Sequence, residues 1–137
     1  HPKAMIGSDG LPHDDHPHPR LWGTFPRVLG HYAREHSLFT LEEAVRRITS
    51  LPAAQFGLME RGKLNVGSYA DLVLFNQKTV IDRATFEAPT RAAEGIDLVM
   101  VNGRTVWENG GATGARPGLA LRRQSLGQMG SNTASGC

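Results

Sequence analysis

A short apolar run that ends at a glycine-flanked aspartate constrains this chain more than any other feature. Residues 4–6 (Ala-Met-Ile) are followed by Gly-Ser-Asp-Gly and then by a proline at position 12. This pattern predicts a buried strand that ends in a loop, with Asp9 at its carboxyl end. In parallel α/β sheets and barrels, such side chains face the crevice where ligands bind. Asp9 is therefore a candidate for chemistry; the alternative is an aspartate that only accepts hydrogen bonds from its own turn.

The composition describes a globular domain and excludes several classes of protein. The chain has 137 residues, 39% of them hydrophobic, which is enough for one domain with a core. Its 15 basic and 13 acidic residues leave a net charge of +2, too small to argue for a nucleic-acid partner. No apolar stretch approaches the roughly 18 residues of a membrane helix, so no membrane partner is expected. The only cysteine, Cys137, is the last residue, which excludes an intrachain disulfide and favours a reducing cytoplasm.

A histidine-rich loop follows the predicted strand. Residues 12–20 (Pro-His-Asp-Asp-His-Pro-His-Pro-Arg) hold His13, His16 and His18 beside two aspartates. Imidazole and carboxylate groups are the usual ligands of zinc, which makes a metal site one interpretation. The three prolines exclude a helix or a central strand here and predict a stiff loop. We favour a polar loop at the rim of a site assembled elsewhere over a metal site complete in itself.

Three helices are predicted before residue 58. Apolar residues recur at helical spacing over 26–36, which predicts the first helix. Thr40 and Glu43 form a capping box, in which the threonine hydroxyl accepts from the Glu43 amide while the glutamate reaches back. The helix that begins there is expected to run to about residue 49. A shorter one over 50–57 has a proline in its first turn and a glycine at its end.

After about residue 61 the period of the apolar residues changes to that of strands. An alternating segment over 62–67, a near-continuous buried strand over 70–75, and a pair over 96–101 and 104–108 predict a small antiparallel unit. Asn102 and Gly103 between the last two strands predict a type I′ hairpin turn. Residues 109–118 are expected to form a loop, and the Ser- and Gly-rich residues 124–137 a disordered tail.

Several ordered motifs together resemble the N-acyl-D-amino-acid deacylases, or D-aminoacylases, of the amidohydrolase superfamily. The motifs lie in residues 7–13, 16–30, 86–90 and 114–118, together with the Gly-Lys-Leu-Asn-Val-Gly-Ser-Tyr-Ala-Asp-Leu-Val-Leu-Phe run that begins at Gly62. The resemblance implies an α+β fragment: the last strand and helices of a metal-dependent (β/α)8 barrel, followed by part of an antiparallel β-sandwich. It divides the chain into a barrel piece (1–61), a sandwich piece (62–110), a closing loop (111–123) and the tail.

The resemblance also implies the chemistry. Members of this family use zinc to hydrolyse the amide bond of an N-acyl-D-amino acid, which gives a carboxylate and a free D-amino acid. By similarity, Asp9 is the catalytic acid/base and a metal ligand, and Arg20 binds the substrate carboxylate. A carboxylate can take and return a proton, and the planar guanidinium fork can hold a carboxylate through two parallel hydrogen bonds.

The departures from the family pattern are equally informative. The cysteine and the histidines that hold the family's zinc on earlier strands have no counterpart here, and Cys137 and the His16-Pro17-His18 run are in the wrong places to replace them. We therefore expect a carboxyl-terminal portion that does not turn over substrate alone. Its apolar faces would stay exposed or be hidden by self-association. The alternatives are another amidohydrolase, such as a dihydroorotase or hydantoinase relative, and a non-catalytic metal-binding β-rich module.

Overall fold

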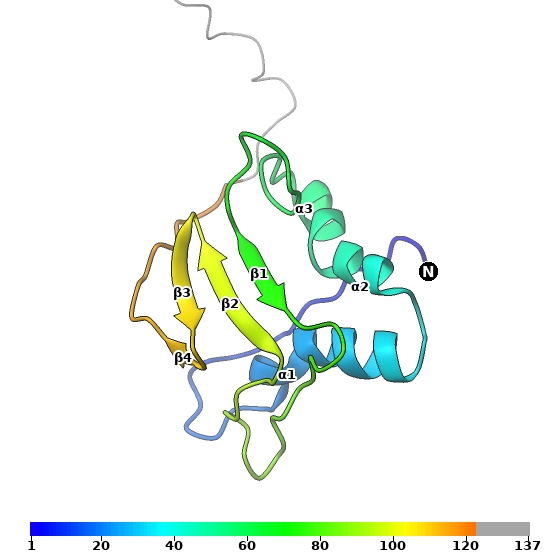
Figure 1. Ribbon diagram of the computed structural model, residues 1–137, viewed down its shortest axis with the longest axis vertical. Helices are drawn as coiled ribbons and strands as arrows, with labels where there is room; N and C mark the ends of the chain where they lie inside the picture. The colour runs from blue at the N-terminus through cyan, green and yellow to red at the C-terminus, as the bar shows by residue number, and fades with distance from the viewer. Residues whose placement is uncertain (123–137) are drawn as a thin grey trace, which may run out of the picture.

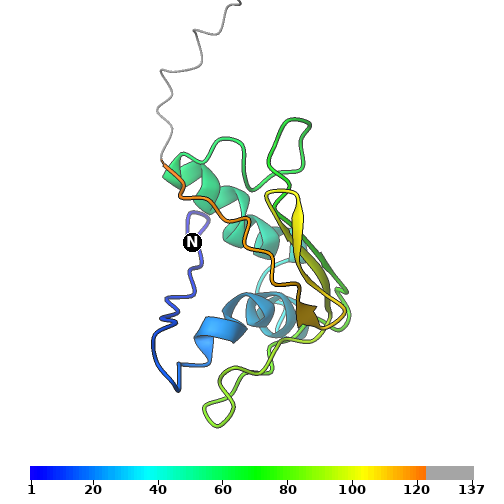
Figure 2. The same cartoon turned by 90° about the vertical axis from the view of Figure 1, so that its left-hand side faces the viewer.

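The chain folds into a layer of helices packed on one side of a small antiparallel sheet. The computed structural model describes residues 1–122, so the predicted disordered tail and Cys137 lie outside the described residues. Figures 1 and 2 show the two layers, with the extended amino-terminal segment running along the helical side. The elements in chain order are α1 (Arg20–Arg27), the π-helical segment η1 (Val28–Glu35), α2 (Leu41–Ile48), α3 (Ser50–Phe56), β1 (Leu72–Phe75), β2 (Ile96–Val101), β3 (Arg104–Glu108) and β4 (Gly111–Ala112).

The sheet has the order β1-β2-β3-β4, and every neighbouring pair is antiparallel. The predicted hairpin turn is confirmed: Asn102 and Gly103 have φ values of 49° and 75°, the left-handed conformation that a type I′ turn requires. A second Asn-Gly pair at 109–110 has the same conformation and returns the chain into β4, which pairs with β3. The prediction of a continuous loop over 109–118 is therefore wrong at its beginning.

Two predicted strands are absent from the described structure. Residues 4–6 form no ladder; their one long-range backbone bond runs from the Ile6 amide to the carbonyl of Arg47 in α2, at 3.2 Å. A strand needs a neighbouring strand to pair with, and within residues 1–122 none lies beside this segment. Residues 62–67 form a bend at 62–63 and a turn at 66–67 instead, because Gly62 and Gly67 take φ values of 72° and 87° and interrupt the extended backbone.

The helices largely follow their local signals. The Thr40 hydroxyl accepts from the Glu43 amide at 3.2 Å, and α3 ends at Gly57 with φ of 71°, as predicted. The helix expected over 26–36 instead starts at Arg20, after Pro19 in a helical conformation at its N-cap. Pro26 lies inside this helix, where it has no N–H to donate to the preceding turn. Directly after α1 the helix changes from α-helical to the wider π-helical geometry of η1.

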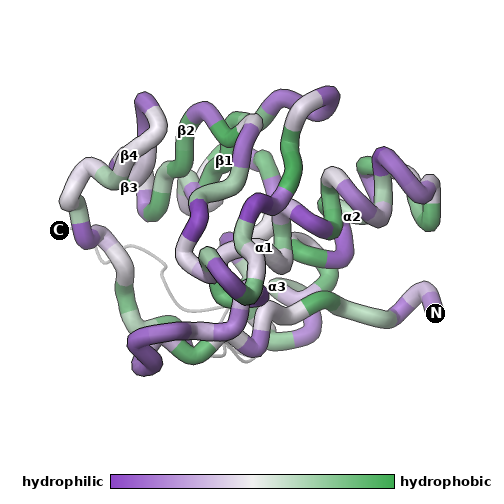
Figure 3. The backbone as a smooth tube through the Cα atoms, turned by 90° about the horizontal axis from the view of Figure 1, so that it is seen from below, coloured by the Kyte–Doolittle hydropathy of each residue, from purple (hydrophilic) through white to green (hydrophobic). Residues whose placement is uncertain are grey.

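The core lies between the helices and the end of the sheet that carries the β1–β2 loop. It consists of Val28, Leu29, Ala33, Ala44 and Val80, with Val80 and Ala44 completely buried. The prediction that β1 is a buried strand is wrong, because Val73 and Leu74 are 53% and 59% exposed. Figure 3 shows hydrophobic stretches along β1 and β2 as well as in the helical layer. None of the described helices has the length and apolar character needed to cross a membrane.

A polar cluster joins the turn of the β2–β3 hairpin to the segment that precedes β1 and to the segment that follows β4. Arg61 pairs with Asp71 and donates to the Asn102 side chain at 2.6 Å, while the Asn102 amide donates to Asp71 at 2.8 Å. The Asn102 side chain in turn donates to the Pro117 carbonyl. Burial alone would raise the pKa of Asp71, but the Asn102 amide and the Arg61 guanidinium lower it. The cluster therefore ties the hairpin turn to the segment between α3 and β1 and to the segment after β4.

The Glu43 side chain departs from the capping box. Its carboxylate does not reach back to Thr40; it accepts from Arg46 and from Arg47, each at 2.7 Å, one turn further along α2. Opposite charges at these spacings are neighbours on a helix surface. The hydrogen bonds from Arg46 and Arg47 lower the pKa of Glu43 from 4.5 to about 2.

We expect Glu43 to make the stability of the chain depend on acid pH. Because its pKa is lower in the folded state, the unfolded chain binds the proton first, and stability falls as the pH drops from about 5 towards 2. The contribution is modest because water screens an exposed pair. Thermal melting of the wild type and of Glu43→Gln between pH 2 and 6 measures it: the two midpoints should converge at pH 2 and separate above pH 5. Parallel curves would contradict this assignment.

Candidate functional site

The structure brings together the two residues that the family resemblance assigns to catalysis and substrate binding. Asp9 follows the extended amino-terminal segment, and Arg20 is the first residue of α1. The Arg20 Nη2 atom lies 3.1 Å from Asp9 Oδ2, and the Arg20 Nε–H donates to the Asp9 carbonyl at 2.9 Å. One guanidinium therefore holds both the backbone and the carboxylate of Asp9.

Asp9 has a backbone conformation that restricts which residues can replace it. Its φ of 48° lies in the left-handed region, which aspartate and asparagine tolerate better than most other residues. The carboxylate is open, with 82% of the side chain exposed, and the Arg20 side chain is 41% exposed. The pair is thus accessible to a small molecule from solvent.

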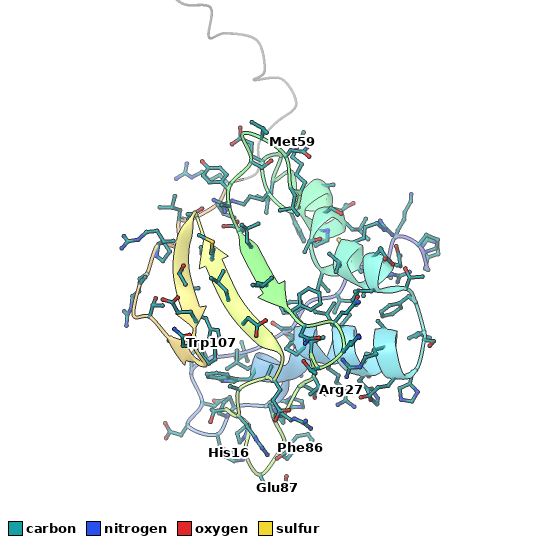
Figure 4. All side chains as sticks on the ribbon, viewed as in Figure 1. His16, Arg27, Met59, Phe86, Glu87 and Trp107 are labelled. Carbon is teal, nitrogen blue, oxygen red and sulfur yellow. The ribbon has the colours of Figure 1, made fainter. Side chains whose placement is uncertain are left out.

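His18 contacts Arg20 and His16 contacts Phe86, and the two histidines form no metal site in residues 1–122. The Arg20 amide donates to His18 Nδ1 at 3.1 Å, which places the proton of a neutral His18 ring on Nε2. His16 Nε2 donates to the Phe86 carbonyl at 2.7 Å, and the His18 and Phe86 rings meet edge to face at 5.0 Å. Figure 4 shows His16 and Phe86 side by side on the same end of the molecule. Sequence reasoning singled out both histidines but missed Phe86, although it lies in one of the family-like motifs.

The residues present do not by themselves fit a zinc ion. In residues 1–122, no group of three or more His, Cys, Asp or Glu side chains is arranged to hold a metal. Asp9 is a single carboxylate already paired with Arg20, and His16 and His18 are engaged by Phe86 and Arg20. The interpretation of the histidine loop as a complete metal site is therefore not supported within these residues.

Comparison with known proteins gives the class of this chain. The family model described as "Amidohydrolase family" matches residues 3–107. The chain therefore belongs to the amidohydrolase family.

Within that family the chain is similar to the D-aminoacylases, as its motifs predict. It is 61% identical over 120 residues to the D-aminoacylase of Alcaligenes xylosoxydans xylosoxydans, covering 88% of this chain and 25% of that one. A solved D-aminoacylase, described for its binuclear metal center, matches with a TM-score of 0.79 and 64% identity over 81% of this chain and 23% of its own. The N-acyl-D-glutamate deacylase from Bordetella bronchiseptica, solved with zinc and a phosphonate inhibitor, matches with a TM-score of 0.82 and 57% identity over 89% and 26%. The chain thus spans about a quarter of the length of these relatives.

Proposed function

We propose that this chain is the carboxyl-terminal part of a zinc-dependent N-acyl-D-amino-acid deacylase, to which it contributes Asp9 and Arg20. The single observation that carries the proposal is the 3.1 Å contact between these two side chains, in a sequence 61% identical to a D-aminoacylase. Under this proposal residues 1–61 belong to the catalytic barrel, residues 62–110 to a β-sandwich, and residues 111–123 close the fold. The zinc ligands besides Asp9 would come from outside the described residues.

Asp9 has the properties that a proton-transfer group in amide hydrolysis needs. Water adds to the acyl carbon, the carbon–nitrogen bond breaks, and a proton must pass from the water to the leaving nitrogen. A carboxylate can accept that proton and return it as a general acid. The exposed Asp9 carboxylate is open to both partners, and Arg20 holds its backbone in place.

Arg20 has the donors for the carboxylate of an amino-acid product. Its Nε and Nη2 atoms contact Asp9, so an incoming carboxylate would compete with Asp9 for part of the guanidinium fork. A guanidinium shared between the two carboxylates would hold the substrate beside the proton-transfer group. Selection of the substrate by its charge and delivery of the proton are then coupled.

The proposed function is tested with a full-length deacylase, by which we mean a protein of the relatives' length that contains this chain. A chimera in which this chain replaces the matching quarter of the Alcaligenes D-aminoacylase serves the purpose. With added zinc, the protein should hydrolyse an N-acetyl-D-amino acid and leave the L enantiomer largely intact. A different result is that a protein of the relatives' length that contains this chain hydrolyses dihydroorotate or a hydantoin and leaves N-acetyl-D-amino acids intact. That result would favour the alternative amidohydrolase classes.

The chain by itself is expected to show no deacylase activity even with zinc. The reason is that no group of three or more His, Cys, Asp or Glu side chains in residues 1–122 is arranged to hold the ion. The measurement is amine release from an N-acetyl-D-amino acid by the purified chain, with the full-length deacylase as the positive control. Zinc-dependent turnover by the isolated chain would contradict the proposal that the site is shared.

Replacing Arg20 should weaken substrate binding more than turnover. Arg20→Met removes charge-assisted hydrogen bonds, and we expect KM in the full-length deacylase to rise about 10-fold to 100-fold. Arg20→Lys keeps the charge but loses the fork, so it should recover only part of the loss. An unchanged KM in Arg20→Met, measured with a correctly folded protein, would remove Arg20 from the substrate site.

A further inference from the structure

We infer that Phe86, at the tip of the β1–β2 loop, is a positioning residue that sets the place of Arg20 through His18. The inference rests on the proposed function, because Arg20 matters to catalysis only if it serves the active site. It assigns a role to a residue 66 positions away from Arg20 in the sequence.

The β1–β2 loop is built firmly enough to position another segment. Its two sides are bridged between Ile81 and Glu94, and Arg83 pairs with Glu94 at 2.6 Å. At the tip, the Thr85 amide donates to the Ala88 carbonyl at 3.2 Å, and the Ala88 amide donates back to the Thr85 hydroxyl at 3.1 Å. These bonds form a closed turn around Phe86, and Figure 4 shows this turn at the lower end of the molecule.

The base of the same loop is fixed to α1. The Arg27 guanidinium donates to Asp82 at 3.1 Å, and the Asp82 side chain is only 11% exposed. Gly23 in α1 lies against it so closely that a Cβ there would sit 3.2 Å from the Asp82 Cβ. Because its base is held by the end of α1, the loop presents its tip to the segment that precedes α1.

Phe86 contacts that segment in two independent ways. Its carbonyl accepts from His16 Nε2 at 2.7 Å, and its ring meets the His18 ring edge to face, with the ring planes at 77°. Phe86 is 68% exposed, and His18 is the aromatic partner that its ring meets among residues 1–122. The arrangement is that of an attractive aromatic pair rather than of core packing.

His18 passes this restraint on to Arg20 and Asp9. Its Nδ1 accepts from the Arg20 amide at 3.1 Å, which fixes the backbone at the start of α1. The Arg20 side chain then reaches back to the carbonyl and the carboxylate of Asp9. Phe86, His18, Arg20 and Asp9 thus form one continuous series of contacts. We expect loss of the Phe86 ring to loosen His18 and, through its hydrogen bond with the Arg20 amide, the start of α1.

The test compares Phe86→Leu, Phe86→Tyr and Glu87→Gln in the full-length deacylase. Phe86→Leu should lower kcat/KM for an N-acetyl-D-amino acid about threefold to tenfold, mostly through KM, because an edge-to-face pair is lost and Arg20 shifts. Phe86→Tyr keeps the ring and should restore the wild-type value. Glu87→Gln changes the neighbouring side chain but keeps a carbonyl oxygen that can still accept from the Thr85 hydroxyl, so it should have no effect. The melting temperature should stay the same in all three.

Hydrogen exchange followed by mass spectrometry separates this inference from the proposed function. Peptides spanning residues 9–22 should exchange faster in Phe86→Leu than in the wild type or Glu87→Gln, whether or not the protein is a deacylase. If these peptides exchange faster in Phe86→Leu but the wild-type protein has no deacylase activity, the proposed function is wrong and the Phe86–His18 contact is still supported. Unchanged exchange and unchanged KM in Phe86→Leu would overturn the inference. So would a loss of activity that Phe86→Tyr fails to rescue, or that accompanies a fall in melting temperature.

Discussion

Asp9→Asn in the full-length deacylase is expected to lower kcat about 100-fold to 10,000-fold, which is the usual contribution of a general acid–base group. Asparagine has nearly the shape of aspartate and also tolerates the φ of 48° at this position. It can still contact Arg20, but it cannot take a proton from water and return it to the leaving nitrogen. Asp9→Ala should be at least as inactive, with an additional backbone cost because alanine disfavours this conformation.

The matched control is Asp15→Asn, which changes an exposed aspartate in the adjacent histidine loop. It should keep the wild-type kcat. Both proteins should be assayed with excess zinc, and their bound zinc should be measured, so that a loss of metal is distinguished from a loss of proton transfer. If Asp9→Asn binds zinc normally and keeps more than half of the wild-type kcat, the assignment of Asp9 as acid/base is wrong.

Gly30→Ala is expected to destabilise the fold strongly, because it places a methyl group against the backbone of the core. Gly30 lies in η1, where a Cβ would be only 2.3 Å from the Val80 carbonyl oxygen and 2.8 Å from Ile81 Cδ1. Val80 is completely buried, and the atom in the way belongs to the backbone, so the clash cannot be relieved by turning a side chain. Overpacking of this kind costs about 1 to 3 kcal/mol, and we expect a value at the upper end.

Urea unfolding of the wild type and Gly30→Ala measures this cost. Gly118→Ala is the matched control, because a Cβ at Gly118 meets no atom within 4 Å and the backbone is not left-handed there. The control should lie within about 0.5 kcal/mol of the wild type. An equally small effect of Gly30→Ala would mean that η1 and the β1–β2 loop are not held together at Val80 as closely as the structure shows.

The predictions from sequence succeeded where the signal lies within a few neighbouring residues. Thr40 caps α2, Gly57 ends α3, and Asn102-Gly103 turns the hairpin, because each depends on the sterics and hydrogen bonds of a single turn. The family motifs also identified the chain as a relative of the D-aminoacylases. The catalytic and binding roles of Asp9 and Arg20 stay predictions.

The predictions from sequence were wrong where the structure of a segment depends on which other elements pack or pair with it. Residues 4–6 have the composition of a strand but meet α2 through a single backbone bond, at Ile6, and not another strand. Val73 and Leu74 have the composition of buried strand residues, yet more than half of each is exposed. Successive strand residues point to opposite faces, and the buried core lies at the end of the sheet that carries the β1–β2 loop, so it covers neither of them. Apolar composition states what a segment can bury, but the neighbouring elements decide whether it is buried.

By itself, the sequence determined the helix caps and the hairpin, because each depends on a few neighbouring residues. It also determined the family of this protein, because the family motifs can be compared directly. Only the tertiary structure decided that Arg20 holds Asp9 across 11 positions, and that Phe86 contacts His16 across 70. Pairing over such distances depends on the path of the whole chain. The Phe86–His16 contact in particular depends on the Arg27–Asp82 pair, which fixes the β1–β2 loop to α1. No local pattern of residues specifies that path.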